Sequence, residues 1–232
     1  MRVSSLLILY CLSCAAHAGT PTRIEAEYDV LVRGIKMHDV HEVFVRRDNQ
    51  YRIQSVIKPV GLLALFQPET TVITSEGEVA DDGLRPHKFT QSRTKSPEKN
   101  TRADFDWEHH TLTVSDRAGI RRMPLPAHTQ DRLSAMYQFV IVPPRARLKL
   151  DLQVTNGSKL QPYDYLLDPT RTVKVPFGEV RSYYLHTPPQ ATPWKSEIWL
   201  AIDHDFFPAK MALTEDNGSQ VMQMLRKLDI EP

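Results

Sequence analysis

The strongest constraint in this 232-residue chain is a series of short runs in which apolar and polar residues alternate. Such alternation places the apolar side chains on one face of an extended segment, and it is typical of half-buried β-strands. The runs extend from Ile24–Val32 to Gln220–Leu228 and are separated by Pro, Gly, Asp and Asn. Parallel strands would need long crossover connections, usually helices. The pattern therefore predicts an antiparallel sheet.

Three gaps between these runs carry dipeptides that favour tight hairpins: Asp82-Gly83, Asn156-Gly157 and Asn217-Gly218. Both dipeptide types accept the positive φ angles of primed turns, whose twist matches that of paired strands. We therefore expect one all-β domain over residues 19–232. Its predicted form is a strongly curved antiparallel sheet or an incomplete β-barrel, with one amphipathic helix packed in or over its mouth.

The predicted helix is Thr129–Val142, where the alternation stops. Thr129 is placed to cap its start, and Pro143-Pro144 would end it. Its apolar residues recur at helical spacing and form one stripe: Leu133, Met136, Tyr137, Val140 and Ile141.

A second segment, Gly61–Phe66, is uniformly apolar and lies between Pro59 and Pro68. Burying its large side chains would be worth on the order of 10 kcal/mol, so we expect something to cover them. The favoured interpretation packs them into the core of the sheet. In a second interpretation they line an apolar cavity together with the helix stripe, and in a third they contact a membrane or a partner.

The cavity interpretation defines the candidate ligand-binding residues. The segment and the helix stripe would line the cavity through Leu62, Leu63, Leu65, Phe66, Leu133, Met136, Tyr137 and Val140. The rim would hold aromatic rings that carry a polar N–H group, for which the candidates are Trp107, Trp194 and Trp199.

The first eighteen residues have the features of a secretory signal peptide. Arg2 precedes the apolar stretch Val3–Leu12, and Ala16-His17-Ala18 forms a cleavage site, so we expect cleavage after Ala18 and a periplasmic protein. The apolar stretch is too short to cross a hydrocarbon core of about 30 Å, which predicts no integral membrane span. The alternative is a lipid anchor on Cys14, although Cys11 and Leu12 fit a lipobox poorly.

Charge and motif content exclude several classes of function. The chain has 29 Lys and Arg residues against 28 Asp and Glu residues, whereas a nucleic-acid-binding domain carries a basic excess. It contains no nucleophile elbow, zinc-protease helix or phosphate-binding loop. Neighbouring residues, as in His109-His110 and Asp203–Asp205, seldom bind the same ion. We therefore predict no catalytic residue, no metal and no cofactor.

Six basic residues form the densest positive region of the chain: Arg85, Lys88, Arg93, Lys95, Lys99 and Arg102. The favoured interpretation is that they protect a strand edge from aggregation. The alternative is an anion-binding patch.

Eight short motifs are distributed over nearly the whole chain after Ala18. They are Gly61–Phe66, Asp82–Pro86, Phe105–Trp107, Gln130–Ser134, Tyr137-Gln138, Glu197–Ala201, Phe207-Pro208 and Thr214–Gly218. In these motifs the chain resembles the exported proteobacterial proteins grouped as domain of unknown function 3108. The resemblance implies export to the periplasm and implies no reaction. A curved sheet with one helix across its mouth is also similar to periplasmic lipoprotein carriers, an analogy of fold alone.

These observations predict a non-catalytic protein of the cell envelope, with an apolar or lipid-like small molecule bound in a β-cavity. Two alternatives stay open. The first is an interaction or scaffolding module whose partner is another envelope protein, and the second, less favoured, is a hydrolase acting on envelope components.

Overall fold

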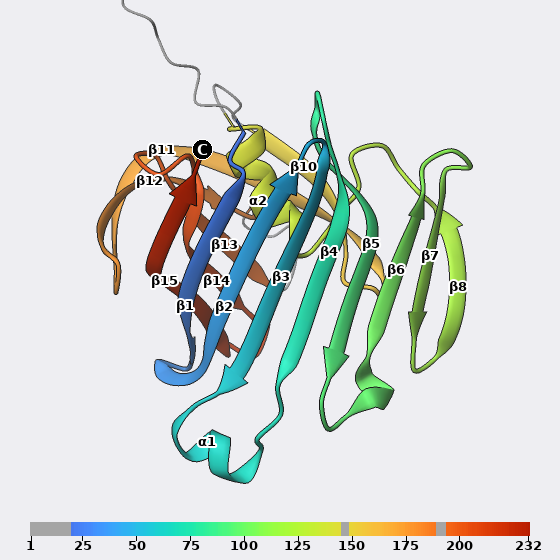
Figure 1. Cartoon of the computed structure of the whole chain (residues 1–232). Coiled ribbons are helices and arrows are strands. Elements are labelled where there is room, and N and C mark those ends of the chain that lie inside the picture. Colours follow the sequence, from blue (N-terminus) through green and yellow to red (C-terminus); the bar gives the residue numbers. More distant parts are fainter. Residues whose placement is uncertain (1–19, 145–148, 189–193) are drawn as a thin grey trace, which may run out of the picture.

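In the part of the chain that the structure describes, fifteen strands form one continuous sheet that curls around one buried helix (Figure 1). This computed structural model describes residues 20–144, 149–188 and 194–232. The predicted signal peptide, residues 1–18, lies outside the described residues. The predicted fold class, a strongly curved antiparallel sheet or incomplete β-barrel with one helix packed in or over its mouth, is confirmed.

The sheet consists of two arms that meet at the first and last strands. The first arm contains β1 (Arg23–Val32), β2 (Ile35–Arg47), β3 (Gln50–Pro59), β4 (Thr71–Ala80), β5 (Gly83–Arg93), β6 (Thr101–Asp106), β7 (Thr111–Asp116) and β8 (Gly119–Pro124). The second arm contains β9 (Gln130–Asp131), β10 (Lys149–Thr155), β11 (Leu160–Val175), β12 (Gly178–His186), β13 (Lys195–Ala201), β14 (Phe207–Thr214) and β15 (Gln220–Glu231). Their order in the sheet is β8 through β1, then β15 through β9. Pairing of β1 with β15 therefore joins the arms.

The three predicted hairpin turns are confirmed, since they connect β4 to β5, β10 to β11 and β14 to β15. The exception to antiparallel pairing is the short parallel bridge between β9 and β10, through Gln130 with Val154 and Asp131 with Thr155.

The strand connections divide the molecule into two ends. Neighbouring antiparallel strands place successive connections at opposite ends of a sheet. One end carries the β1–β2, β5–β6, β7–β8 and β14–β15 connections together with α1 (Gly61–Phe66), which follows β3. We call it the α1 end. The start of β1 and the end of β15, which pair with each other, lie at the opposite end together with the C-terminus (Figure 1).

Side chains join the two arms across the open seam of the barrel. The turn between β10 and β11 approaches β6, β7 and β8. Thr101 Oγ1 donates a hydrogen bond to the Asn156 carbonyl (2.9 Å), and Arg121 Nη2 donates to the Ser158 carbonyl (2.7 Å). Ser158 Oγ and Arg121 Nη2 also bind the Asp116 carboxylate. These contacts replace a strand ladder, which makes the barrel incomplete.

The interior helix, α2, spans Ser134–Ile141 and is shorter than the predicted helix Thr129–Val142. Two residues inside the predicted range instead form β9, whose pairing with β10 the local pattern does not encode. The predicted cap is also wrong, because Thr129 Oγ1 donates to the Pro126 carbonyl (2.8 Å). Asp131 Oδ1 accepts hydrogen bonds from the amides of Leu133 and Ser134, both at 2.9 Å, and so begins the helix.

The other apolar segment, α1, contradicts the favoured prediction that it packs in the core. Leu62, Leu65 and Phe66 are 73%, 75% and 80% exposed. The pairing of β3 with β4 ends at Ile57 with Thr71, so the intervening segment projects beyond the sheet (Figure 1). The prediction that these side chains are buried was wrong, because the positions at which β3 and β4 stop pairing decide whether the segment between them reaches the core.

The interpretation of the basic region as strand-edge protection is also wrong. Strand β5 pairs with β4 on one side and with β6 on the other, so it is not an edge. Three of the six residues make ion pairs: Arg85 with Glu78, Arg93 with Glu69 and Arg102 with Asp104.

The seam generates a pH-dependent prediction. Hydrogen bonds, first from Arg121 and then from Ser158, lower the pKa of Asp116 from its usual 3.8 to about 2. A carboxyl whose pKa is lowered by folding stabilises the fold above its unfolded pKa, and this contribution is lost as the pH falls through the folded value. We expect Asp116→Asn to lower the thermal midpoint at neutral pH, with the difference disappearing as the pH approaches 2.

The matched control is Glu98→Gln, which removes an exposed carboxyl that lies at the same end and makes no ion pair within the described chain. Its thermal midpoint should equal that of the parent throughout the same pH series. Equal midpoints for Asp116→Asn and the parent at neutral pH would show that the seam contact does not stabilise the barrel.

Candidate ligand-binding cavity

A buried carboxylate fixes α2 inside the barrel. Asp131 is fully buried, and besides beginning α2 it accepts a hydrogen bond from Ser75 Oγ on β4 (2.5 Å). Ser75 in turn bonds to the hydroxyl of Tyr51 on β3 (3.1 Å). Burial raises the pKa of the Asp131 carboxyl, and the hydrogen bonds oppose this shift. The network ties the start of α2 to the first arm, while β9 ties it to the second.

On its side away from the α1 end, α2 packs tightly against aromatic residues. Tyr137 is buried; its ring stacks on Phe44 at 5.6 Å and meets Phe207 edge-on at 5.5 Å. Val140 belongs to the same core cluster. This half of the barrel interior is filled by side chains.

The other half of the interior contains a cavity of about 340 Å³ between α2 and the α1 end. Leu133, Ala135 and Met136 form its roof. Its walls come from both arms and are mainly apolar: Val30, Ile57, Ile73, Leu152, Val154, Tyr163, Tyr165, Ile198, Met211, Ala212, Leu213 and Val221. Ligand sites commonly have volumes of roughly 300–1,000 Å³, so a small apolar ligand fits.

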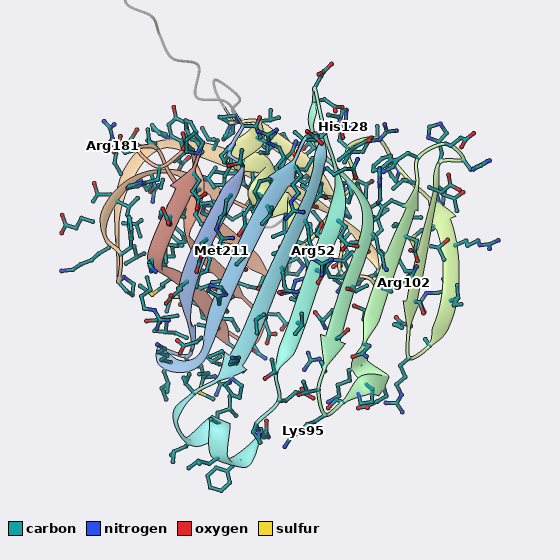
Figure 2. All side chains as sticks on the ribbon, in the orientation of Figure 1. Arg52, Lys95, Arg102, His128, Arg181 and Met211 are labelled. Carbon is teal, nitrogen blue, oxygen red and sulfur yellow. The ribbon has the colours of Figure 1, made fainter. Side chains whose placement is uncertain are left out.

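The cavity opens at the α1 end. Leu213 and Val221 line it and also reach solvent, with exposed fractions of 42% and 37%. They pair with each other where β14 and β15 approach their connection. Met211, one inward-facing position deeper on β14, also lines the cavity (Figure 2). A ligand would therefore enter between the strand ends.

Polar groups lie at the deep part of this cavity. Glu42 is 6% exposed; its Oε1 accepts a hydrogen bond from Ser55 Oγ (3.0 Å) and its Oε2 accepts one from the Tyr137 hydroxyl (3.3 Å). Burial raises the pKa of the Glu42 carboxyl. Because Val40 pairs with Ile57, Glu42 and Ser55 lie one inward-facing position further from the mouth than Ile57.

Arg132 supplies a cation to the same cavity. Its Nη1 donates to Gln91 Oε1 (3.2 Å), the one hydrogen bond of this guanidinium within the described chain. The side chain retains accessible surface, yet burial lowers the pKa of the guanidinium and the nearby Glu42 opposes that shift. We interpret the accessible surface as facing the cavity. A guanidinium has five N–H donors, so Arg132 can bind a further acceptor there.

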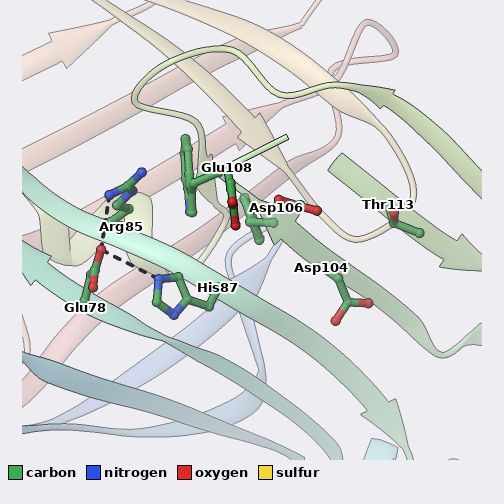
Figure 3. Close-up of a pocket in the computed structure, with 9 residues that line it drawn as sticks. Glu78, Arg85, His87, Asp104, Asp106, Glu108 and Thr113 are labelled. Atoms are coloured by element: carbon green, nitrogen blue, oxygen red, sulfur yellow. Dashed lines mark hydrogen bonds and ion pairs between the residues drawn. The ribbon is translucent and has the colours of Figure 1, made fainter. Parts of the chain in front are cut away.

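A second hollow, of about 730 Å³, lies on the outer face of the first arm (Figure 3). It is open to solvent and lined largely by charged residues, including Glu78, Asp104, Asp106 and Glu108. Glu78 accepts a hydrogen bond from Arg85 Nη1 at 3.3 Å and lies 3.8 Å from His87 Nε2, so its carboxylate already has partners in the hollow. It is larger than the interior cavity, but it is shallow and would enclose little of a ligand, so we favour the interior cavity as the functional site.

Comparison with known proteins establishes the family. A family model described as "Protein of unknown function (DUF3108)" matches residues 27–226. The chain belongs to the DUF3108 family. No curated protein gives a significant match to it.

A solved structure resembles the DUF3108 chain in fold. It is a β-barrel-like protein of domain of unknown function DUF1849 from Brucella abortus, with a TM-score of 0.56 and 12% sequence identity. The match covers 90% of this chain and 98% of the other. The likeness confirms the barrel-like fold and extends no further. Within the described DUF3108 residues, no helix has the length and apolar content that crossing a bilayer requires.

The structure separates the residues that the sequence grouped into one site. Leu133 and Met136 line the cavity of the DUF3108 chain, whereas Tyr137 and Val140 are buried in the core and do not line it. The four residues of α1 do not line it: Leu62, Leu65 and Phe66 are exposed, and Leu63 is half-buried. The residues of the predicted stripe are therefore divided between the lining of the cavity and the packed core.

The tryptophans also occupy different places. Trp107 donates from Nε1 to the Pro86 carbonyl (2.7 Å) and lines the outer hollow. Trp199 lies between two inward-facing residues of β13, on the outer face, with Lys210 over its ring at 4.6 Å. The prediction that Trp107 and Trp199 lie at the rim of the cavity is therefore wrong. Trp194 lies beside the cavity wall, with its ring 5.1 Å from that of Tyr163.

Sequence reasoning missed the polar residues of the cavity. Glu42 occupies an inward-facing position between Val40 and Phe44 on β2. A charged residue at a position where the alternation expects an apolar one could have indicated a polar group in the interior. Arg132 has no such signal, because its place depends on the β9–β10 bridge. Among the described residues, no three His, Cys, Asp or Glu side chains are grouped to hold a metal ion.

The anchor of α2 gives a stability prediction. Asp131→Ala would leave the amides of Leu133 and Ser134 and the Ser75 hydroxyl without their acceptor. Unpaired buried groups cost about 1–3 kcal/mol each, so with three such groups we expect the free energy of unfolding to fall by about 3 kcal/mol or more in urea titrations. Asp131→Asn keeps an acceptor oxygen and should lose less. A loss below about 1 kcal/mol for Asp131→Ala would contradict the assigned anchor.

Proposed function

We propose that this DUF3108 protein is a non-catalytic protein of the periplasm that binds an apolar, lipid-like ligand in the interior cavity. The observation that carries the proposal is a mainly apolar cavity, enclosed by both arms and α2, that opens at one end. Native interiors are close-packed, so a space of this size is not explained by packing alone. The signal-peptide features of residues 1–18 support the proposed location.

The chemistry of the cavity indicates an amphiphile with an anionic head. Its walls toward the mouth are apolar, through Ile57, Leu213 and Val221, and would accept an acyl chain. Arg132 lines the same cavity and has donors left for an oxygen ligand. Hydrogen bonds between a guanidinium and a carboxylate are among the strongest in proteins. The proposed ligand therefore places its head toward Arg132 and its chain toward the mouth.

A cavity-filling substitution tests the proposed site. Leu152 lines the cavity on β10, so Leu152→Trp should fill part of it and weaken binding of palmitic acid by about tenfold or more, equivalent to about 1.4 kcal/mol. Binding is measured by displacement of the fluorescent fatty acid cis-parinaric acid. Gln153→Trp adds the same ring to the opposite face of the strand and should bind as the parent does.

Failure of the parent protein to bind either fatty acid would contradict the proposed function. Equal binding by the parent and Leu152→Trp, with the indole shown by fluorescence to be buried, would place the ligand elsewhere.

The role of Arg132 is tested by changing the ligand head. Arg132→Gln should weaken palmitic acid binding by about tenfold to a hundredfold, since a hydrogen bond to a charged group contributes about 1.5–3 kcal/mol. Binding of hexadecanol, which has no charge, should change little. The same loss for both ligands would show that Arg132 shapes the cavity and does not recognise an anion.

A further inference from the structure

The exposed apolar residues of the described chain gather at one end. The large hydrophobic side chains that remain exposed are Ile35, Leu62, Leu65, Phe66, Ile120, Leu213 and Val221. All seven lie in or beside connections at the α1 end, and we call them the apolar rim. Exposed hydrophobic residues scattered singly need no explanation, but a group at one end marks an interaction surface.

The most prominent part of the apolar rim is α1, which the fold holds in place. The amide of Val60 donates to the Met37 carbonyl on β2 (2.9 Å). On the other side, the amide of Thr94 donates to the Thr70 carbonyl and the amide of Thr70 to Thr94 Oγ1, both at 3.0 Å. The exposed side chains of α1 therefore project from an anchored loop.

Positive charge surrounds this apolar tip. The flanking loops and strand ends carry exposed cations that make no ion pair within the described chain: Arg33, Lys58, Lys95, Lys99 and Arg117. Figure 2 shows Lys95 beside α1, whereas Arg181 and His128 lie at the opposite end. Three exposed carboxylates at the α1 end also lack an ion pair, and two of them, Glu215 and Asp216, are in the β14–β15 connection away from α1. The third is Glu98, between Lys95 and Lys99.

We propose that the apolar rim docks the protein on an anionic phospholipid surface, with α1 inserted among the headgroups. Apolar side chains flanked by lysine and arginine are the combination that binds interfacial lipid, because burial of the apolar groups adds to attraction by anionic lipids. A bilayer accepts such projecting side chains without a preformed pocket. The docked orientation places the mouth of the cavity against the membrane.

This proposal concerns the surface and holds whether or not the cavity contains a ligand. The test is flotation of the full-length mature protein with phosphatidylcholine vesicles prepared with and without phosphatidylglycerol. We expect stronger binding to the vesicles that contain phosphatidylglycerol and weaker binding as salt is raised, since surface charge interactions are screened.

Two double variants separate the apolar and electrostatic contributions. Leu65→Gln/Phe66→Gln should lower partitioning to both kinds of vesicle by about tenfold, because it removes the inserted groups. Lys95→Glu/Lys99→Glu should lower it by about tenfold on the anionic vesicles alone. All four side chains are exposed, so the fold should persist, and circular dichroism checks this.

Two controls complete the test. Lys174→Glu/Lys227→Glu makes the same charge change at two exposed lysines on β11 and β15, away from α1, and should leave vesicle binding unchanged. Leu152→Trp should bind palmitic acid more weakly and bind vesicles as the parent does. Failure of the proposed ligand site is therefore distinguishable from failure of the docking proposal. Absence of vesicle binding by the parent would overturn the docking proposal. So would a concentration-dependent dimer that Leu65→Gln/Phe66→Gln abolishes, because a second copy would then cover α1.

Discussion

The buried carboxylate of Asp131 determines how the interior of this barrel is divided. It begins α2 by accepting two helix amides, and through Ser75 it fixes that beginning against the first arm. The adjacent β9–β10 bridge fixes it against the second arm. A helix of eight residues is too short to fill the interior of a curved sheet of fifteen strands. The position of α2 therefore decides which half of the interior is packed with side chains and which half contains the cavity.

The division of the interior gives the two ends of the molecule different properties. Away from the α1 end, aromatic stacking around Tyr137 makes a dense core. Toward the α1 end, the cavity, its exposed lining residues and the projecting α1 segment lie together. The seam formed by Asp116, Arg121 and Ser158 keeps the arms together without a continuous ladder. A cavity that opens beside an apolar, positively flanked surface is consistent with exchange of a lipid-like molecule at a membrane.

The elements that the sequence predicted correctly are encoded locally. Alternation over Ile24–Val32 and the Asn217-Gly218 dipeptide specify a strand and a turn without reference to distant residues. The errors arise where distant segments decide. The start of α2 depends on β9 reaching β10, and the exposure of Phe66 depends on where β3 and β4 cease to pair. The cavity combines Glu42 and Arg132 from separate parts of the chain, and no local spacing indicates that they share one cavity.

The most direct test of the central claim is anomalous diffraction from crystals of the protein bound to a fatty acid brominated at its terminal carbon. We expect a bromine peak near the mouth, beside Leu213 and Val221, with the carboxylate density at Arg132. A bromine peak in the outer hollow beside Trp107, or an interior cavity that stays empty at saturating fatty acid, would rule out the proposed binding site.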